Sequence, residues 1–193
     1  MNNLNRFLII LFILFFNFST FGQYGATFEP YGGRSATELY YEADEARMRK
    51  DYEKAFILLT QARSLDPNNN SVLNSLGYLY EKVFGNYNKA VEHYTRSANG
   101  GNTHAMLNLG RIYYEGKIVP QNYQEAIKWY HKAADYESGI AMYNLGYLYL
   151  MGKGTPKNKD MAIYWYKAAA AKGLPVAKEA LEILEKGRYF FIF

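Results

Sequence analysis

The residues of this chain that could do chemistry do not lie at catalytic spacings. Its three histidines are His93, His104 and His131, and it contains no cysteine. The histidines fall at different positions of the repeat described below, so nothing in the sequence aligns them as a metal site. Without cysteine the chain has no thiol nucleophile, zinc–thiolate site or disulfide. It also lacks the Gly-x-Ser-x-Gly motif that exposes a catalytic serine on a strand-to-helix turn.

A glycine-rich tetrapeptide is the remaining candidate for chemistry. Gly152-Lys153-Gly154-Thr155 superficially resembles a phosphate-binding loop. It lacks the glycine-to-lysine spacing of such loops and follows no expected strand, so we interpret it as a loop between helices. The net charge of +4 comes from both signs interleaved along the chain, unlike the clustered basic face of a nucleic-acid-binding protein. The sequence therefore predicts no enzyme, no cofactor, no metal site and no nucleic-acid partner.

The elements that must position any binding residues follow a repeat. Ala55, Ala90, Ala126 and Ala162 each lie near the start of an apolar or aromatic-rich segment, and their separations are 35, 36 and 36 residues. A fixed period in this range is typical of helical pairs that stack and bury their apolar faces on one another. We therefore expect an all-α protein, a right-handed α-solenoid of about four helix-turn-helix repeats plus a C-terminal capping helix.

Turn residues such as Pro67 and Gly173 separate the expected helices. The expected pairs are 36–49 with 52–65, 70–83 with 87–98, 103–114 with 122–134, and 138–150 with 158–172, and the capping helix covers 175–186. Pairs and cap together form an expected repeat domain over 36–187.

Small residues at fixed repeat positions predict where the paired helices cross. Three glycines lie mid-helix, where glycine costs about 1 kcal/mol relative to alanine. We expect close approach of the partner helix to offset this cost, with alanines as the matching small residues. The glycines are Gly77, Gly110 and Gly146, and the alanines are Ala90, Ala126 and Ala162. Aromatic residues at repeat positions are expected to fill the space between pairs; they are Tyr80, Tyr113, Tyr149, Trp129 and Trp165.

The ends of the chain differ from the repeats. Arg6 precedes an unbroken apolar run over 7–16, an order typical of a secretory signal, so we expect a signal peptide over 1–22 with the mature chain starting near Gln23. An uncleaved N-terminal anchor is the alternative. A glycine-containing segment over 23–35 is expected to be a flexible linker, and 188–193 is an apolar tail that docks on the repeats or meets a partner. After cleavage we expect no membrane span, and we expect an exported, periplasmic or secreted protein.

The third and fourth units resemble the Sel-1-like repeat, a relative of the tetratricopeptide repeat. The matching residues of the third unit are Gly110, Tyr113, Gly116, Val119, Ala126, Trp129, Tyr130, Ala133 and Ala134. Those of the fourth are Gly146, Tyr149, Gly152, Gly154, Ala162, Trp165, Tyr166, Ala169, Ala170 and Gly173. Asn122 and Asn158 replace the acidic residue that the family usually has in its long intra-pair loop. The second unit is a hybrid and the first resembles an ordinary tetratricopeptide repeat, so the resemblance covers about residues 36 to 175.

The resemblance implies that the first helix of each pair lines a concave surface where partners, often peptides, bind. One candidate row directly follows the crossing glycines, and an Arg between two Tyr is suited to gripping a peptide backbone or carboxylate. This row is Tyr78, Arg111 and Tyr147, a second row is Asn74, Leu107 and Tyr143, and the next turn adds Glu81, Tyr114 and Leu150. The alternative is that these residues are solvated or packed on one another. As ordinary surface residues, truncations such as Arg111→Ala would change stability by no more than about 0.5 kcal/mol.

The sequence thus predicts a non-catalytic scaffold or adaptor in the cell envelope that binds a protein or an extended peptide in its concave groove. Two alternatives stay open: a cell-wall-related enzyme or enzyme accessory, and an N-terminally anchored envelope assembly factor. An enzyme would need an active serine or paired carboxylates in a pocket.

Overall fold

The computed structural model of the chain describes residues 30–185. The chain divides into two units, Met1–Arg34 and Ser35–Phe193. The expected signal peptide over 1–22, residues 23–29 of the expected linker and the apolar tail over 188–193 lie outside the described residues. In the first unit, the described part of the linker forms a short 3-10 helix, η1 (Pro30–Gly33).

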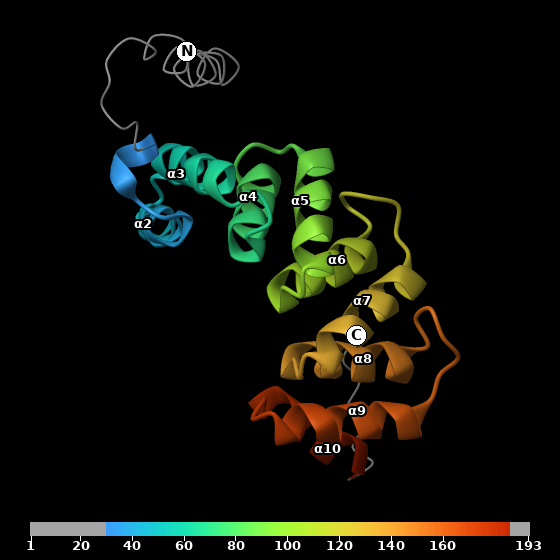
Figure 1. Cartoon of the computed structure of the whole chain (residues 1–193). Coiled ribbons are helices and arrows are strands. Elements are labelled where there is room, and N and C mark those ends of the chain that lie inside the picture. The colour runs from blue at the N-terminus through green and yellow to red at the C-terminus, as the bar shows by residue number, and fades with distance from the viewer. Residues whose placement is uncertain (1–29, 186–193) are drawn as a thin grey trace, which may run out of the picture. The chain divides into compact units, whose positions relative to one another are not determined.

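The second unit consists of paired helices in chain order (Figure 1). The pairs are α2 (Ala36–Met48) with α3 (Tyr52–Leu65), α4 (Asn70–Lys82) with α5 (Tyr87–Asn99), α6 (Thr103–Glu115) with α7 (Tyr123–Asp135), and α8 (Gly139–Met151) with α9 (Lys159–Ala171). A final helix, α10 (Pro175–Glu185), follows them. Residues 30–185 contain no strand, and every helix boundary lies within one residue of the one expected from the sequence. The all-α repeat fold is therefore confirmed. None of the described helices is long and apolar enough to cross a membrane.

The helices begin where a polar side chain can accept a free backbone N–H. The side chain at each N-cap of α2 to α9 accepts such a bond, and the caps are Ser35, Asp51, Asn69, Asn86, Asn102, Asn122, Ser138 and Asn158. Asn122 and Asn158 stand where the family usually has an acidic residue, and asparagine caps a helix as well as aspartate does. Their Oδ1 atoms accept from the N–H groups of Glu125 at 3.0 Å and Met161 at 2.9 Å. This departure from the family pattern therefore leaves the helix starts intact.

Each crossing glycine of the second, third and fourth pairs faces a tyrosine ring of the partner helix. A Cβ atom on Gly110 would lie 2.4 Å from Cε1 of Tyr130, which is closer than real side chains approach. Gly77 and Gly146 meet Tyr94 and Tyr166 in the same way, at 2.7 Å. The alanines predicted as the matching small residues, Ala90, Ala126 and Ala162, lie four residues before these tyrosines. These alanines are fully buried, and the tyrosine rings are the nearest groups to the space that each glycine leaves.

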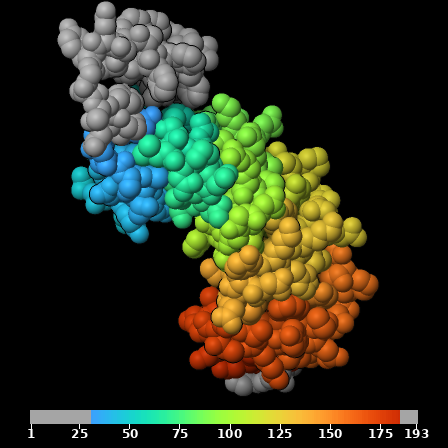
Figure 2. Space-filling model, in the orientation of Figure 1, coloured from blue at the N-terminus to red at the C-terminus, as the bar shows by residue number. Residues whose placement is uncertain are grey.

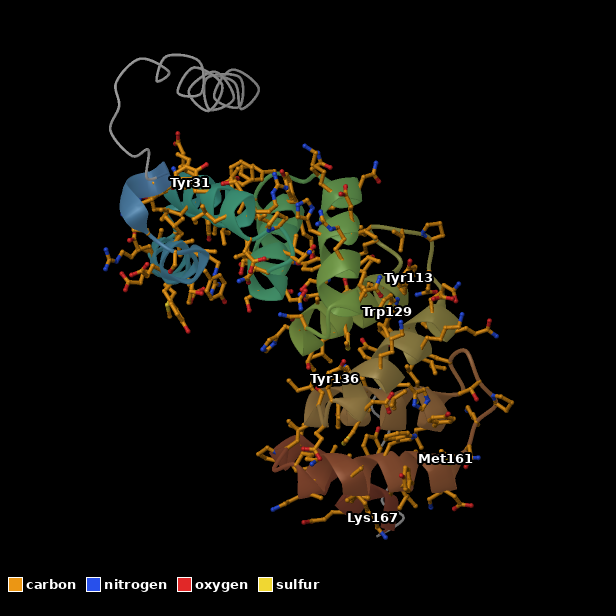
Figure 3. All side chains as sticks on the ribbon, viewed as in Figure 1. Tyr31, Tyr113, Trp129, Tyr136, Met161 and Lys167 are labelled. Atoms are coloured by element: carbon orange, nitrogen blue, oxygen red, sulfur yellow. The ribbon has the colours of Figure 1, made fainter. Side chains whose placement is uncertain are left out.

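The aromatic residues expected between pairs are only partly core. Tyr80 is 5% exposed, whereas Tyr113, Tyr149, Trp129 and Trp165 are half-buried; Figure 3 labels Tyr113 on α6 and Trp129 on α7. The fully enclosed positions instead belong to the tyrosines at the glycine crossings, because their rings lie between the two helices of one pair.

The pairs stack in the order of the chain, as the succession of colours in Figure 2 shows within the repeat unit. Contacts between consecutive pairs run from α3 to α4, α5 to α6, and α7 to α8, and α10 packs on α9. Leu184 of α10 is buried with Ala162 and Tyr166 of the last pair, and Leu181 packs beside them. This is the arrangement expected of a capping helix, which covers the apolar flank of a terminal repeat.

Candidate protein-binding surface

The first helices of the four pairs form a connected surface, which we call the first-helix surface (α2, α4, α6 and α8). The Arg47 guanidinium lies 5.6 Å from the centroid of the Tyr78 ring and joins α2 to α4. Glu81 and Arg111 form an ion pair of 2.8 Å that joins α4 to α6. The Tyr114 and Tyr147 rings lie 6.3 Å apart and join α6 to α8. A side-chain contact therefore crosses each of the three junctions between neighbouring first helices.

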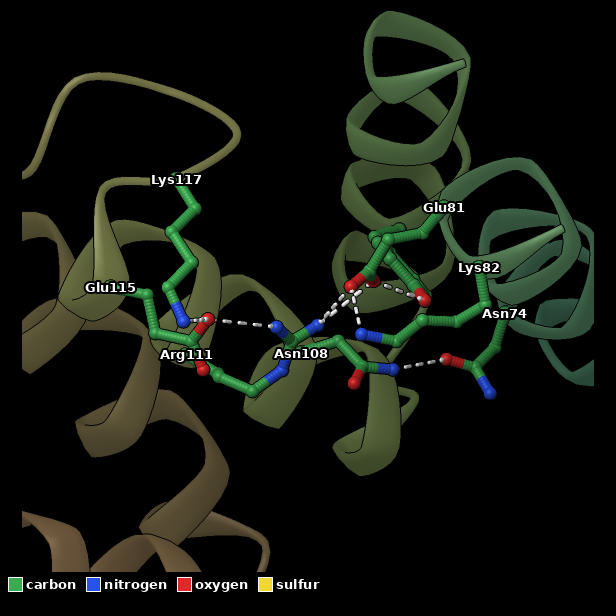
Figure 4. Close-up of polar contacts among 8 residues, drawn as sticks. Asn74, Glu81, Lys82, Asn108, Arg111, Glu115 and Lys117 are labelled. Atoms are coloured by element: carbon green, nitrogen blue, oxygen red, sulfur yellow. Dashed lines mark hydrogen bonds and ion pairs between the residues drawn. The ribbon is translucent and has the colours of Figure 1, made fainter. Parts of the chain in front are cut away.

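A polar cluster forms the middle of this surface (Figure 4). Nη2 of Arg111 donates to both carboxylate oxygens of Glu81 at 2.8 Å. The same carboxylate accepts from Tyr94 at 3.0 Å and pairs with Lys82 at 2.6 Å. Arg111 also reaches Glu115 at 3.6 Å. Since Arg111 is held by two carboxylates of its own chain, a ligand carboxylate would have to compete with Glu81 for it.

The carboxylate of Glu81 stays ionised in this cluster. Its side chain is 3% exposed, and burial alone would raise its pKa. The hydrogen bonds from Lys82, Arg111 and Tyr94 outweigh burial, so the pKa of Glu81 lies below its ordinary value. Burial and the Glu81 charge raise the pKa of Tyr94, so its hydroxyl remains neutral and donates to Glu81. Glu81 is therefore a structural anion. It has neither the raised pKa of a general acid nor a second carboxylate bonded to it.

The structure places Glu81 differently from the groove position considered in the sequence analysis. The residue is 6% exposed and its oxygens point at Arg111, Lys82 and Tyr94, so it cannot contact a partner without leaving them. Its physical role is to hold Arg111 in place. Arg111 itself, with Tyr78 and Tyr147, is half-buried and keeps part of its surface accessible.

The second candidate row is partly packed. Asn74 accepts a hydrogen bond of 3.2 Å from Nδ2 of Asn108, and this bond links α4 to α6. Asn108 was not among the predicted site residues. Tyr143 packs its ring 5.3 Å from that of the core residue Tyr166. Leu107 is half-buried, as is Leu150, which packs against the core formed by the last pair and α10. These residues mainly pack against other residues of the chain, and they add little accessible area to the first-helix surface.

A second cluster, which we call the Lys153 cluster (Tyr114, Tyr123, Tyr147 and Lys153), lies where the first-helix surface meets the start of α7 and the loop after α8. Nζ of Lys153 donates to the hydroxyl of Tyr114 at 2.7 Å and lies over three tyrosine rings. Of its members, Tyr123 and Lys153 were not predicted as site residues. The tetrapeptide beginning at Gly152 is a loop between helices, as the sequence analysis expected, but its lysine points back to α6.

Comparison with protein families decides what kind of repeat this is. The model of the Sel1 repeat matches residues 34–67, 72–102, 103–135 and 139–174. Each match covers most or all of one observed helical pair. The chain belongs to the Sel1 repeat family. Repeats of this family generally act as non-catalytic scaffolds for protein–protein interaction.

Solved Sel1 repeat structures share the fold of this Sel1 repeat protein. A Sel1 repeat protein from Oxalobacter formigenes is 34% identical with a TM-score of 0.65, over 74% of this chain and 57% of that one. The protective antigen c5321 of uropathogenic Escherichia coli, which displays an SLR fold, is 26% identical with a TM-score of 0.71, over 79% of this chain and 34% of that one. The chain therefore spans only part of the length of these two relatives.

A third similarity concerns the fold alone. Cysteine rich protein B of Helicobacter pylori is 23% identical with a TM-score of 0.52, over 78% of this chain and 99% of that one. Since this Sel1 repeat protein has no cysteine, packing and helix caps hold its repeats together without disulfides. A search of curated proteins gave no match.

The three histidines of this Sel1 repeat protein lie in different environments. His93 is 4% exposed, and Nδ1 lies 2.8 Å from the carbonyl of Lys89 while Nε2 lies 3.1 Å from Nη1 of Arg63. A carbonyl only accepts and a guanidinium only donates, so the neutral ring with its proton on Nδ1 fits this position. His131 packs against Trp165, and His104 is exposed. Within residues 30–185, no group of three or more metal-binding side chains comes together.

Proposed function

We propose that this Sel1 repeat protein is a non-catalytic scaffold that binds an extended segment of a partner protein along its first-helix surface. The observation that carries the proposal is the unbroken series of contacts Arg47–Tyr78, Glu81–Arg111 and Tyr114–Tyr147 across three repeat junctions. Such a series gives one ligand access to several repeats at once. An enzyme is not favoured, because the buried carboxylate of the surface is held ionised by its neighbours.

The contacts also prepare the surface for binding. Side chains already held by neighbours lose little conformational freedom when a ligand arrives, which favours affinity. Tyrosine and arginine dominate the binding energy of many protein interfaces because they bury large areas at low entropic cost. Since Arg111 is engaged by Glu81, we assign the main anchoring role to Tyr78 and Tyr147, with Arg111 presenting its guanidinium face between them.

Capture of a partner by paired variants tests the scaffold. Tyr78→Ala and Tyr147→Ala, made together, should reduce partner capture from a cell extract at least tenfold, as expected for the loss of two interface anchors. The matched control is Tyr164→Ala on α9, which removes a tyrosine that is 59% exposed on a second helix. Equal capture by the double variant and the control, with both folded, would contradict the proposal.

We also propose that the scaffold acts outside the cytoplasm, in the periplasm or as a secreted protein. The support is the order of a basic residue at Arg6, an apolar run over 7–16 and small residues before Gln23. Mass spectrometry of the protein from its native cell should find a mature N-terminus within a few residues of Gln23. A membrane-bound form that keeps residues 1–22 would instead support the N-terminally anchored assembly factor. An intact soluble form in the cytoplasm would refute export.

A further inference from the structure

The ammonium group of Lys153 is held by side chains from three helices. Nζ donates to the Tyr114 hydroxyl at 2.7 Å and lies 4.7 Å from the centroid of that ring. The centroids of Tyr147 and Tyr123 are 5.3 and 5.4 Å away. These residues come from α6, α7 and α8, and aromatic faces within about 6 Å attract a cation. The lysine is therefore positioned before any ligand is present.

The backbone of the loop fixes the same position. Gly152 ends α8 in the left-handed conformation at φ 69°, and the N–H of Lys153 bonds to the carbonyl of Leu148 at 3.0 Å. Gly154 is also left-handed at φ 73°, and a Cβ there would lie 2.7 Å from Cβ of Tyr123. Two glycines thus let the loop lie directly on the start of α7, with Lys153 between them.

The charge of Lys153 has no counter-charge within residues 30–185. It forms no ion pair with a described carboxylate, and Glu115, next to Tyr114, is shared by Arg111 and Lys117 at 3.6 Å. An ammonium group has three donor hydrogens, and the bond to Tyr114 uses one. This end of the first-helix surface is therefore prepared for an anion.

We propose that Lys153, framed by Tyr114, Tyr123 and Tyr147, is the anion-binding position of the first-helix surface and takes a carboxylate of the bound peptide. The inference rests on the proposed scaffold function and names the chemistry of its ligand. A single ammonium group balances the one negative charge of a carboxylate, whereas a phosphate group brings a charge of about −1.5 to −2 at pH 7 and would call for a second cation. The carboxylate belongs either to the C-terminus of the partner or to an Asp or Glu side chain.

Nuclear magnetic resonance titration of the full chain with three probe peptides tests the site. The probes are acetyl-Gly-Ser-Gly-Ser-Gly with a free C-terminus, the same peptide amidated, and amidated acetyl-Gly-Ser-Asp-Ser-Gly. We expect at least one carboxylate probe to shift the ring signals of Tyr114 and Tyr147, and the amidated probe without Asp to leave them unchanged. A shift by the first probe assigns the C-terminal carboxylate, and a shift by the third assigns a side chain.

Variants of Lys153 separate charge from shape. Lys153→Met keeps a long apolar stem but removes the charge. It should lower the affinity for the carboxylate probe about tenfold or more, as expected for the loss of a charge-assisted hydrogen bond. Lys153→Arg should restore most of the binding, and the control Lys178→Met on the exposed side of α10 should change nothing. Circular dichroism should show every variant folded at the temperature of the titration, although Lys153→Met loses the hydrogen bond to Tyr114 and the contacts with the tyrosine rings.

Three results would overturn the proposal: binding of the uncharged probe as tightly as the carboxylate probes, no binding of either carboxylate probe, or unchanged binding by Lys153→Met. Tighter binding of inorganic phosphate than of both carboxylate probes would overturn the choice of carboxylate. Failure here is distinguishable from failure of the scaffold. If the double variant of Tyr78 and Tyr147 loses partner capture while Lys153→Met binds the probes normally, only the anion site is wrong.

Discussion

Removal of the Arg111 guanidinium is expected to destabilise the repeat stack. Arg111→Ala leaves the Glu81 carboxylate 3% exposed in its native position, with only Lys82 and Tyr94 as partners. Breaking a buried pair by removing one partner costs about 3–5 kcal/mol when nothing replaces it. Here two donors remain and the Arg111 side chain is 30% exposed, so water can partly replace the lost bonds. We therefore expect a loss of about 1–3 kcal/mol in the free energy of unfolding.

Urea denaturation of four proteins measures this loss. They are the parent, Arg111→Ala, Glu81→Gln and the double variant, compared by the shift of the unfolding midpoint at constant slope. The double variant should be more stable than the sum of the single losses predicts, because removing the second charge relieves the unpaired first one. If Arg111→Ala stays within about 0.5 kcal/mol of the parent, as expected for ordinary surface, and the coupling is near zero, the ion pair does not join α4 to α6 as described.

Three further predictions concern stability. Gly110→Ala should destabilise by about 1–2 kcal/mol in urea denaturation although alanine favours helices, because its Cβ would overlap the buried Tyr130 ring; a variant as stable as the parent would contradict the crossing. Burial lowers the pKa of His93 below 6.5, although the hydrogen bond to the Lys89 carbonyl raises it, and the Arg63 charge lowers it further. The stability that the neutral His93 ring contributes is therefore complete above pH 6.5 and is lost as the pH falls through the pKa of the folded protein. Melting temperatures between pH 7.5 and 5 should show this loss, and His93→Gln should remove it; an unchanged slope would show that His93 does not titrate. Asn158→Ala should cost about 0.5–2 kcal/mol by removing the N-cap of α9, measured in the same way, and no loss would contradict the cap.

The helix boundaries could be predicted from the sequence because they depend on local signals. A period of 35 to 36 residues sets the number of pairs, and Asn, Ser and Asp at the turns mark the helix starts. The tyrosines at the crossings could also have been found, since Tyr94, Tyr130 and Tyr166 each follow the repeat alanine by four residues. The alanines recur at the same period as the tyrosines, and spacing alone does not say which of the two lies nearest the glycine.

The polar part of the candidate site could not be predicted in this way. The row Tyr78, Arg111 and Tyr147 follows from repeat register, but the bond from Arg111 to Glu81 depends on side-chain reach across a junction. The position of Lys153 was still harder to predict, because its contact with the Tyr114 ring requires the left-handed backbone of two loop glycines. Residues brought together by loop conformation and long side chains have no periodic signal in the sequence.

Site-specific photo-crosslinking tests the central claim most directly. A benzophenone amino acid placed at position 147 on α8 and, in a separate protein, at position 164 on α9 reports which face of one pair meets the partner. The scaffold account predicts cross-linked partner from position 147 and none from position 164, although Tyr164 is 59% exposed. Cross-linking from position 164 and not from position 147 would show that the partner binds the second helices, and the first-helix surface would not be the binding site.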